Sequence, residues 1–221
     1  MKARGIGFSE VNAAICDALY NCFPGSICMI TAPSKNHLDQ TLNKVWGGMT
    51  FANDNTDGGF FKLRQVLDKA DVKRASYYKI VNGQKIEAGW NSEIKGLVAD
   101  DDAKIRGARV DLLIFEEAGS NPNARRSFIK GDALVGIGGN RFGIKLIGGT
   151  GGDRNPKALD GLREIYEDPR AFNILPFYHN YTESGDWVET GYFIPSYIAK
   201  YKSSLVDSRG VCNWKKAKQE E

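Results

Sequence analysis

The opening run KARGIGFS contains residue types that suit a phosphate group. Gly5 and Gly7 permit a tight backbone turn with its N–H groups pointing inward, and a helical pattern begins near Ser9. The start of a helix presents the positive end of its dipole, which favours a bound anion. In that arrangement the Ser9 hydroxyl would reach a magnesium ion beside the phosphates. Taken alone, a glycine-rich turn before a helix is more often only a turn.

A second candidate lies in VDLLIFEEAGS, where an apolar strand ends in the adjacent carboxylates Glu116 and Glu117. Glu116 is placed to hold a hydrated magnesium ion, and Glu117 to orient and deprotonate an attacking water. Asp111 precedes the same strand, so we discount it as a metal ligand and expect solvation or capping. The plain alternative for two glutamates before an alanine is a helix start with a favourable dipole interaction.

A third strand end, in LIGGTGG, places Thr150 where a polar side chain could sense a γ-phosphate. In a parallel α/β sheet the ligand sites lie outside the carboxyl ends of the strands, so these three segments would meet at one edge. An additional-strand P-loop ATPase has its elements in this same order: a loop and helix, then a strand with paired carboxylates, then a strand ending in Gly-Gly-Thr. The sequence therefore predicts ATP and Mg²⁺ as ligands.

The elements that must position these residues follow from periodicity. One helix is predicted after Ser9, with an apolar face formed by Val11, Ala14, Ile15, Ala18 and Leu19. A second helix is indicated by Leu38, Leu42, Val45 and Trp46, and residues 50–60 have the Asn, Asp and Gly content of a mobile loop. Residues 75–90 predict an antiparallel hairpin around Asn82-Gly83, because both residues tolerate positive φ.

Short apolar runs at 26–31, 110–115 and 142–149 predict strands covered on both faces, with about one helix's worth of sequence between the last two. A further helix is expected over 155–166, followed by a strand at 171–178. The fold class is thus α/β, a P-loop, RecA-like ATPase core with a mainly parallel sheet flanked by helices. We expect this core to span 1–180 and a small C-terminal linker subdomain to span 181–221.

Composition sets the outer bounds. The chain has 221 residues, a net charge of +3 and 42% hydrophobic residues, which suits a folded protein and is too weakly basic to indicate nucleic-acid binding by itself. Cys16, Cys22, Cys28 and Cys212 show no zinc-site spacing and are expected to be buried small hydrophobes in a reducing compartment. The apolar stretches are strand-sized and no signal peptide is evident, so no membrane is expected and the cytoplasm is the default.

Four stretches together resemble the ATPase domain of the large terminase subunit, the DNA-packaging motor of tailed phages. They are KARGIGFS, IRGARVDLLIFEEAGS, LIGGTGG and GYFIPSYIAKYKSSLVDSRGVCN, and the resemblance extends over nearly the whole chain. Some terminases have a deviant Walker A motif whose lysine stands at the front, as K-x-x-x-x-G-[YF]-S, and Lys2 matches that place. A lysine has a long, flexible stem that could approach the β- and γ-phosphates from the other end of the loop.

The resemblance also implies further roles. Arg4 matches an arginine proposed in this family to stabilise transition-state charge, which a planar guanidinium meets well, although a surface arginine is the alternative. Glu117 matches the catalytic glutamate and Thr150 the coupling motif, while Phe8 need only pack within the nucleotide-binding run. Glu116 is one methylene longer than the usual Walker B aspartate.

Several other residues are weaker candidates. The run Asp100–Asp102 could suggest two-metal nuclease chemistry, but a solvated loop accounts for it better. Arg106 resembles a family position and equally suits a structural hydrogen bond. Arg125 and Arg126 could contact DNA or a neighbouring subunit. The aromatics of 191–201 more readily pack a linker subdomain than stack on bases.

The implied activity is ATP hydrolysis that drives double-stranded DNA into procapsids. The implied partners are the portal protein, the small terminase subunit and further copies in a ring, at the procapsid portal in the host cytoplasm. The alternatives are another nucleic-acid translocase or helicase, or a non-catalytic fragment with an assembly role. Because Lys2 is the second residue, the strand before the P-loop would lie upstream, and a nuclease domain would follow downstream. We therefore expect the 221-residue chain alone to bind ATP weakly and hydrolyse little.

Overall fold

The computed structural model describes residues 7–57, 65–99, 109–137, 140–149, 164–165, 168–174, 180–183 and 186–189. The chain divides into two compact units. The first, which we call the sheet unit, comprises Ser9–Glu117 and Arg126–Ile147. The second unit comprises Met1–Phe8, Ala118–Arg125 and Gly148–Glu221. The expected boundary between an ATPase core and a linker subdomain near residue 180 stays a prediction.

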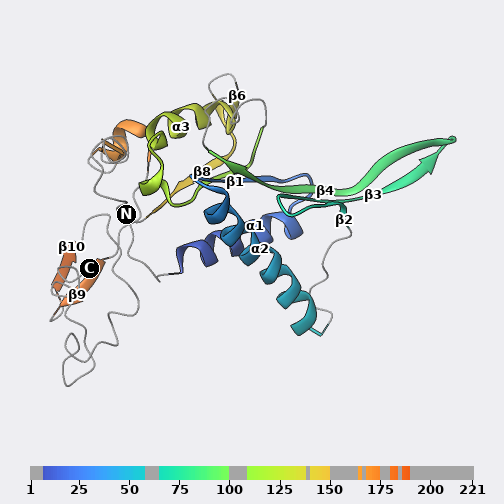
Figure 1. Ribbon diagram of the computed structural model, residues 1–221, viewed down its shortest axis with the longest axis horizontal. Helices are drawn as coiled ribbons and strands as arrows, with labels where there is room; N and C mark the ends of the chain where they lie inside the picture. The colour runs from blue at the N-terminus through green and yellow to red at the C-terminus, as the bar shows by residue number, and fades with distance from the viewer. Residues whose placement is uncertain are drawn as a thin grey trace. The chain divides into compact units, whose positions relative to one another are not determined.

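A six-stranded sheet forms the centre of the sheet unit, in the order β2-β3-β4-β1-β5-β8 (Figure 1). Its strands are β1 (Ile27–Ala32), β2 (Gln65–Asp68), β3 (Val72–Val81), β4 (Gln84–Val98), β5 (Leu112–Phe115) and β8 (Ile144–Ile147). The pairs β4/β1, β1/β5 and β5/β8 are parallel, whereas β2/β3 and β3/β4 are antiparallel. The three predicted apolar strands and the parallel centre of the sheet are therefore confirmed. A short antiparallel pair, β6 (Gly136–Ile137) and β7 (Asn140–Arg141), precedes β8.

The predicted hairpin is also confirmed, with Asn82 and Gly83 at φ values of 51° and 77° between β3 and β4. One feature of β4 was not predicted. Its second half turns into the sheet, where Glu93 pairs with Ile27 and Val98 with Ala32 in parallel register. β4 is thus both an arm of the hairpin and a central strand of the sheet. The Asn82-Gly83 turn predicts the hairpin but does not predict the parallel pairing with β1.

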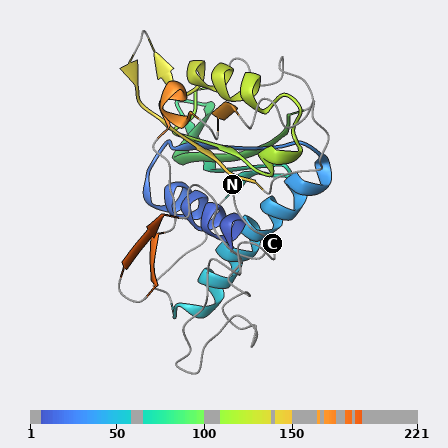
Figure 2. The same ribbon diagram turned by 90° about the vertical axis from the view of Figure 1, so that its left-hand side faces the viewer.

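Two helices cover one face of the sheet and a third covers the other (Figure 2). These are α1 (Phe8–Cys22) and α2 (Lys35–Asn55) on the first face and α3 (Ala124–Lys130) on the second. Gly96 of β4 lets α2 approach closely, because a Cβ there would lie 2.7 Å from a Leu42 methyl carbon. On the other face the Phe128 ring lies 5.5 Å from that of Phe115. Both faces of the parallel strands are thus buried, which explains their continuous apolar sequences.

The second predicted helix is confirmed, with Leu38, Leu42 and Val45 buried in the main core. It begins after Ser34, whose side chain accepts a hydrogen bond from the His37 backbone N–H. The expected loop over 50–60 is wrong for its first part, because α2 continues to Asn55. Hydroxyl and amide side chains there donate to carbonyls four residues earlier, as in the bond from Asn55 to Phe51. Such bonds let turn-forming residue types stay helical.

The helix after Ser9 is confirmed, but its predicted apolar face is only partly turned to the core. Ile15 and Leu19 pack against the core, whereas Val11 is 56% exposed and Ala14 and Ala18 are exposed as well. The buried residues are instead Asn12, Ala13, Cys16 and Tyr20. The buried face therefore includes the polar residue Asn12, which an assignment based on hydrophobic residues alone would place toward solvent.

Two of the expected buried cysteines, Cys16 and Cys28, are indeed buried, whereas Cys22 is exposed and Cys212 lies outside the described residues. A hydrogen bond with Cys28, reinforced by burial, raises the pKa of the Cys16 thiol well above its usual value. Nearby charges, including those of Asp17 and Glu116, act in the same direction. The thiol is therefore neutral and unreactive at neutral pH.

In the second unit the described elements are η2 (Ala118–Ser120), η4 (Pro169–Phe172), β9 (Asn180–Glu183) and β10 (Asp186–Glu189), the last two paired antiparallel. The expected strand over 171–178 is wrong for its first residues, which belong to η4 and its cap. Asp168 accepts from the Ala171 N–H, and Asn173 takes a left-handed conformation at φ 54°. Of the helix expected over 155–166, only residues 164–165 are described, and they are helical.

None of the described helices is long and apolar enough to cross a membrane.

Candidate functional site

The carboxyl ends of the parallel strands and the first turn of α1 meet inside the sheet unit. β5 ends at Phe115, and the Glu116 backbone N–H donates to the Thr31 carbonyl at the end of β1 with an N···O distance of 2.8 Å. Glu116 is thus still held by the sheet ladder. Its side chain is 2% exposed, which is rare for a glutamate and requires polar partners.

Those partners come from α1. The Ser9 hydroxyl donates to Oε2 of Glu116 at 3.3 Å, and the Asn12 side-chain amide donates to Oε1 at 2.7 Å. Ser9 and Glu116 are 107 positions apart in sequence, so this pairing depends on the fold. The structure therefore brings together the two residues that the sequence proposed as magnesium ligands.

The atoms at this position suit a hard cation. Mg²⁺ prefers oxygen ligands and is usually bound by one or two protein groups together with waters and substrate phosphates. Oε2 of Glu116 and the Ser9 hydroxyl supply two such oxygens close together, while Oε1 is occupied by Asn12. Among the described residues no group of three or more His, Cys, Asp or Glu could hold a metal ion.

Asn12 is the residue of this site that sequence reasoning missed. It is 1% exposed, and its amide makes the shorter of the two bonds to Glu116. A donor on Oε1 would fix the plane of the carboxylate and leave Oε2 facing the Ser9 hydroxyl. The only signal in the sequence is a polar residue one turn after Ser9, which by itself indicates a solvent-facing position.

Glu117, the proposed general base, has an unusual backbone. Its φ is 47°, in the left-handed region that costs a residue with a Cβ about 1–2 kcal/mol. Such strained positions cluster at functional sites. The conformation turns the chain away from the line of β5, and the two adjacent glutamates differ in burial: Glu116 is buried, whereas Glu117 is half-buried. Their environments thus differ, as the two separate roles proposed for them require.

Phe8 lies in the second unit, where its ring packs against Gly148. A Cβ on that glycine would lie 2.3 Å from the Phe8 ring, so only glycine fits there. Gly7, just before α1, has a φ of 79° that favours glycine. These contacts agree with a packing role for Phe8 and a tight turn before the helix.

Other proposed residues lie outside the described part of the chain: Lys2, Arg4, Gly5, Thr150, Arg106 and Asp100–Asp102. Their roles stay predictions.

Two further residues have defined positions away from this site. The Asp111 carboxylate accepts from the Ile27 backbone N–H at 2.7 Å, at the start of β1, which is the capping role expected for it. In the second unit Arg125 pairs with Glu164 at 2.5 Å and lies over the Phe172 ring, 5.8 Å from its centroid. Arg125 is therefore already engaged within its own unit.

Comparison with solved structures shows what this fold resembles. A mutant of the Thermus phage P74-26 large terminase ATPase domain matches with a TM-score of 0.58 and 17% identity, covering 99% of this chain and 78% of the other. The same domain without that mutation matches with a TM-score of 0.56 and 18% identity, covering 87% of this chain and 71% of the other. The HK97 bacteriophage large terminase matches with a TM-score of 0.48 and 15% identity, and 36% of its length is covered.

No family model matches the sequence, and no curated protein matches it either. The likeness therefore concerns the fold. The chain has the fold of phage large-terminase ATPase domains, and the expected α/β class, with a mainly parallel sheet flanked by helices, is confirmed.

Proposed function

We propose that the chain is the ATP-hydrolysing motor domain of a large terminase subunit and that it drives double-stranded DNA into viral procapsids. The observation that carries this proposal is the partly buried contact between Ser9 and Glu116, at the junction of α1 and β5. It occurs in a fold like that of known large-terminase ATPase domains. The observed contact makes a chance match of two short motifs a weaker explanation.

In this proposal the Ser9 hydroxyl and Glu116 hold magnesium, with Asn12 fixing the carboxylate. A bound magnesium ion would neutralise charge on the β- and γ-phosphates. Glu117 orients the attacking water and accepts its proton as it adds to the γ-phosphorus. The proton then lies on the Glu117 carboxyl, and the leaving group is ADP.

The remaining roles come from the motif alone. The backbone of Gly5 and Gly7 binds phosphate, Lys2 reaches the β- and γ-phosphates, and Arg4 stabilises charge in the transition state. Phe8 packs the loop in place, and Thr150 couples the nucleotide state to movement. The proposed partners are double-stranded DNA, the portal protein, the small terminase subunit and further copies in a ring. The proposed location is the procapsid portal in the host cytoplasm.

Two substitutions in the full-length protein test this assignment. Glu117→Gln should retain magnesium-dependent nucleotide binding and lose about 10²- to 10⁴-fold in hydrolysis rate, the usual cost of a lost general base. Glu116→Gln should weaken the magnesium-dependent part of binding as well. Glu10→Gln is the matched control, because Glu10 lies on α1 but is exposed and pairs with Lys44.

Nucleotide titration with and without Mg²⁺ and a phosphate-release assay provide the two readouts. Equal turnover by the wild type and Glu117→Gln would overturn the catalytic assignment. Stimulation of hydrolysis by duplex DNA separates a packaging motor from a helicase, which would be stimulated by single strands and would unwind a duplex.

A further inference from the structure

The outer part of the β3–β4 hairpin, residues 77–88, extends beyond the rest of the sheet (Figure 1). β2 pairs with β3 only as far as Ala75, and β1 pairs with β4 only from Glu93 onward. Within the described ranges the outer hairpin therefore pairs only with itself, and no other described strand adjoins either of its edges.

Large side chains on this outer hairpin are exposed. The exposed fractions are 41% for Tyr77, 50% for Tyr78, 76% for Ile80, 41% for Val81 and 38% for Ile86. Directly paired residues share a face, so Tyr78 and Ile80 lie with Lys85 and with Glu87, the partner of Tyr78. Val81 lies on the other face with Lys79 and Ile86. Each face thus combines apolar side chains with one lysine, and the first face also carries Glu87 at its inner end. Contiguous exposed apolar surface is a feature of binding sites, so this surface calls for an explanation.

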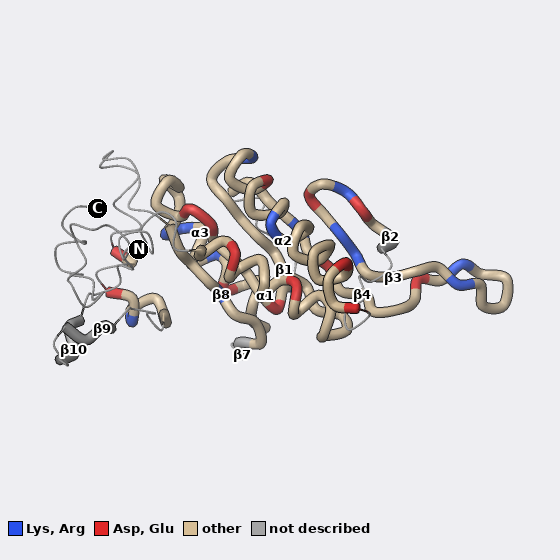
Figure 3. Tube along the Cα trace, turned by 90° about the horizontal axis from the view of Figure 1, so that it is seen from below, with Lys and Arg blue, Asp and Glu red and all other residues tan. Residues whose placement is uncertain are grey.

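The charges of the hairpin are separated along its length (Figure 3). Residues 77–86 contain Lys79 and Lys85 and no acidic residue. Neither lysine forms an ion pair with any other described residue, although the Lys85 ammonium lies 4.1 Å from the centroid of the Tyr78 ring. The outer end therefore presents positive charge on both faces.

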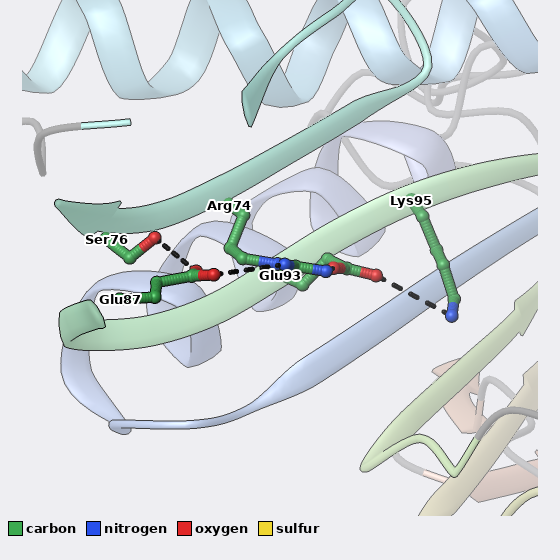
Figure 4. Close-up of polar contacts among 5 residues, drawn as sticks. All are labelled: Arg74, Ser76, Glu87, Glu93 and Lys95. Carbon is green, nitrogen blue, oxygen red and sulfur yellow. Dashed lines mark hydrogen bonds and ion pairs between the residues drawn. The ribbon is translucent and has the colours of Figure 1, made fainter. Parts of the chain in front are cut away.

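The acidic side chains lie nearer the sheet and are held there by one arginine (Figure 4). Arg74 donates to Glu93 at 2.6 Å and lies 3.6 Å from a Glu87 oxygen, while the Ser76 hydroxyl donates to Glu87 at 2.5 Å. Lys95 pairs with Glu93 from the other side at 3.6 Å. Arg74 thus counters the charge of Glu87, the only acidic residue of the outer hairpin, as well as that of Glu93, so these carboxylates do not cancel the two lysines.

The same contacts fix the direction of the hairpin. The strand register shifts between Ala75 and Tyr77, where β4 inserts extra residues that include Gly89 at φ 109° and Asn91 at φ 60°. A bulge of this kind bends a strand pair and redirects its end. Glu93 lies on the sheet side of this shift and Glu87 on the outer side, and Arg74 contacts both. The outer hairpin is thus tied to the sheet at its base.

We propose that the outer hairpin is a contact for duplex DNA, in which Lys79 and Lys85 bind backbone phosphates while the ribbon lies in a groove. A two-stranded β-ribbon fits the major groove, where its aliphatic residues could meet sugars and thymine methyl groups. The rival partner is a protein surface. Against it, lysine is depleted at protein interfaces, and lysines on free edges oppose strand pairing with another chain.

This inference rests on the proposed DNA-translocating function and assigns one of its DNA contacts. Phosphate contacts carry little sequence information, so binding should show slight sequence preference and strong salt dependence.

The test is nucleotide-free binding of a fluorescently labelled 30-base-pair duplex to the full-length protein, measured by anisotropy over a range of salt concentrations. The double change Lys79→Gln with Lys85→Gln should weaken binding and reduce the slope of log K against log salt by about 2, near one unit per lost phosphate contact. The control pair Lys35→Gln with Lys44→Gln removes the same charge from α2, where both lysines already pair with carboxylates, and should leave the slope nearly unchanged.

A further variant separates DNA from a second copy of the chain as the partner. Ile80→Ser with Ile86→Ser should weaken DNA binding and leave the sedimentation behaviour unchanged. A wild-type slope retained by the lysine variant would overturn the inference, as would loss of oligomers with intact DNA binding in the isoleucine variant. Because no nucleotide is present, these outcomes are independent of the hydrolysis assay: a chain that binds DNA through the hairpin but never hydrolyses ATP would overturn only the proposed function.

Discussion

Glu116 and Ile80 lie in the same sheet unit and occupy opposite environments. Glu116 is a charged side chain with 2% exposure at the end of β5, and Ile80 is an apolar side chain with 76% exposure near the end of β3. The first is stabilised by the two hydrogen bonds from Ser9 and Asn12. The second lies where the outer hairpin extends past the other strands, and no other described strand pairs with the hairpin there (Figure 1).

Each of these placements lowers the stability of the fold relative to a more usual residue at that position. A buried carboxylate loses its hydration, and an exposed isoleucine forgoes the gain from burial. A buried polar group and an exposed apolar patch are both more informative than the usual arrangement. The two regions therefore indicate separate functions, a ligand site at the strand ends and a contact surface on the outer hairpin.

The largest contrast is expected between two isoleucines in strands. Ile30 in β1 is completely buried, and Ile30→Ala should reduce the free energy of unfolding by about 2–5 kcal/mol through lost burial and a cavity. Ile80→Ala should change it by about 0.5 kcal/mol or less. Urea denaturation of both variants measures the difference. A large loss for Ile80→Ala would mean that the hairpin is packed within the protein.

A smaller loss is expected from Asn12→Ala, which removes the shorter bond to the Glu116 carboxylate. Hydrogen bonds to charged groups contribute about 1.5–3 kcal/mol, so a destabilisation of this size should appear in urea denaturation. Asn21→Ala is the matched control on the same helix, because its amide donates only to the Asp17 backbone carbonyl of α1 itself. If the two alanine variants were equally stable, the bond from Asn12 to Glu116 would contribute no more to the free energy of unfolding than the local bond of Asn21.

The hairpin turn should be sensitive to a single methyl group. Gly83 has φ 77°, so Gly83→Ala should cost about 1–2 kcal/mol. Gly47→Ala is the contrasting control: Gly47 lies inside α2 with open space around its Cβ position, and alanine should stabilise the helix there by about 0.5–1 kcal/mol. Thermal melts of the two variants should therefore shift in opposite directions.

The smallest effect concerns Asp17, a second acidic group that is partly removed from water. Burial raises its pKa from 3.8 to about 7, its Oδ1 atom has no hydrogen-bond partner, and a Cβ on Gly48 of α2 would lie 2.5 Å from its other carboxylate oxygen. The folded state thus binds this proton more tightly than the unfolded state. Its contribution to stability is complete below about pH 4 and is lost as the pH rises toward 7, although solvent at this partly exposed carboxylate weakens the effect.

Asp17→Asn should therefore gain stability relative to the wild type as the pH rises from 4 to 8. Urea denaturation at several pH values measures this trend, with Asp71→Asn as an exposed control that removes the same charge. A wild-type minus variant difference that stays constant across this range would show that Asp17 is not desolvated.

Contrasts of this kind also mark the limit of sequence reasoning for the fold. The strands of the parallel centre were predictable because burial on both faces requires continuous apolar runs, and the Asn82-Gly83 turn because few residue pairs adopt two positive φ values. The end of α2 was not, because side-chain bonds to the backbone there outweighed the turn preference of the residues themselves. Nor was η4, because the bond from the Ala171 N–H to Asp168 forms a helical turn where the apolar run predicted a strand.

For the candidate site, the residue types could be read from the sequence: a glycine-flanked helix start with Ser9, and the Glu116-Glu117 pair at a strand end. Three features emerge only in the folded chain: Ser9 meets Glu116, Asn12 points inward to the same carboxylate, and Glu117 has a positive φ. Local propensity and periodicity describe only how a segment by itself prefers to fold. Which polar side chain enters the core depends on a partner more than 100 positions away that must have its hydrogen bonds satisfied.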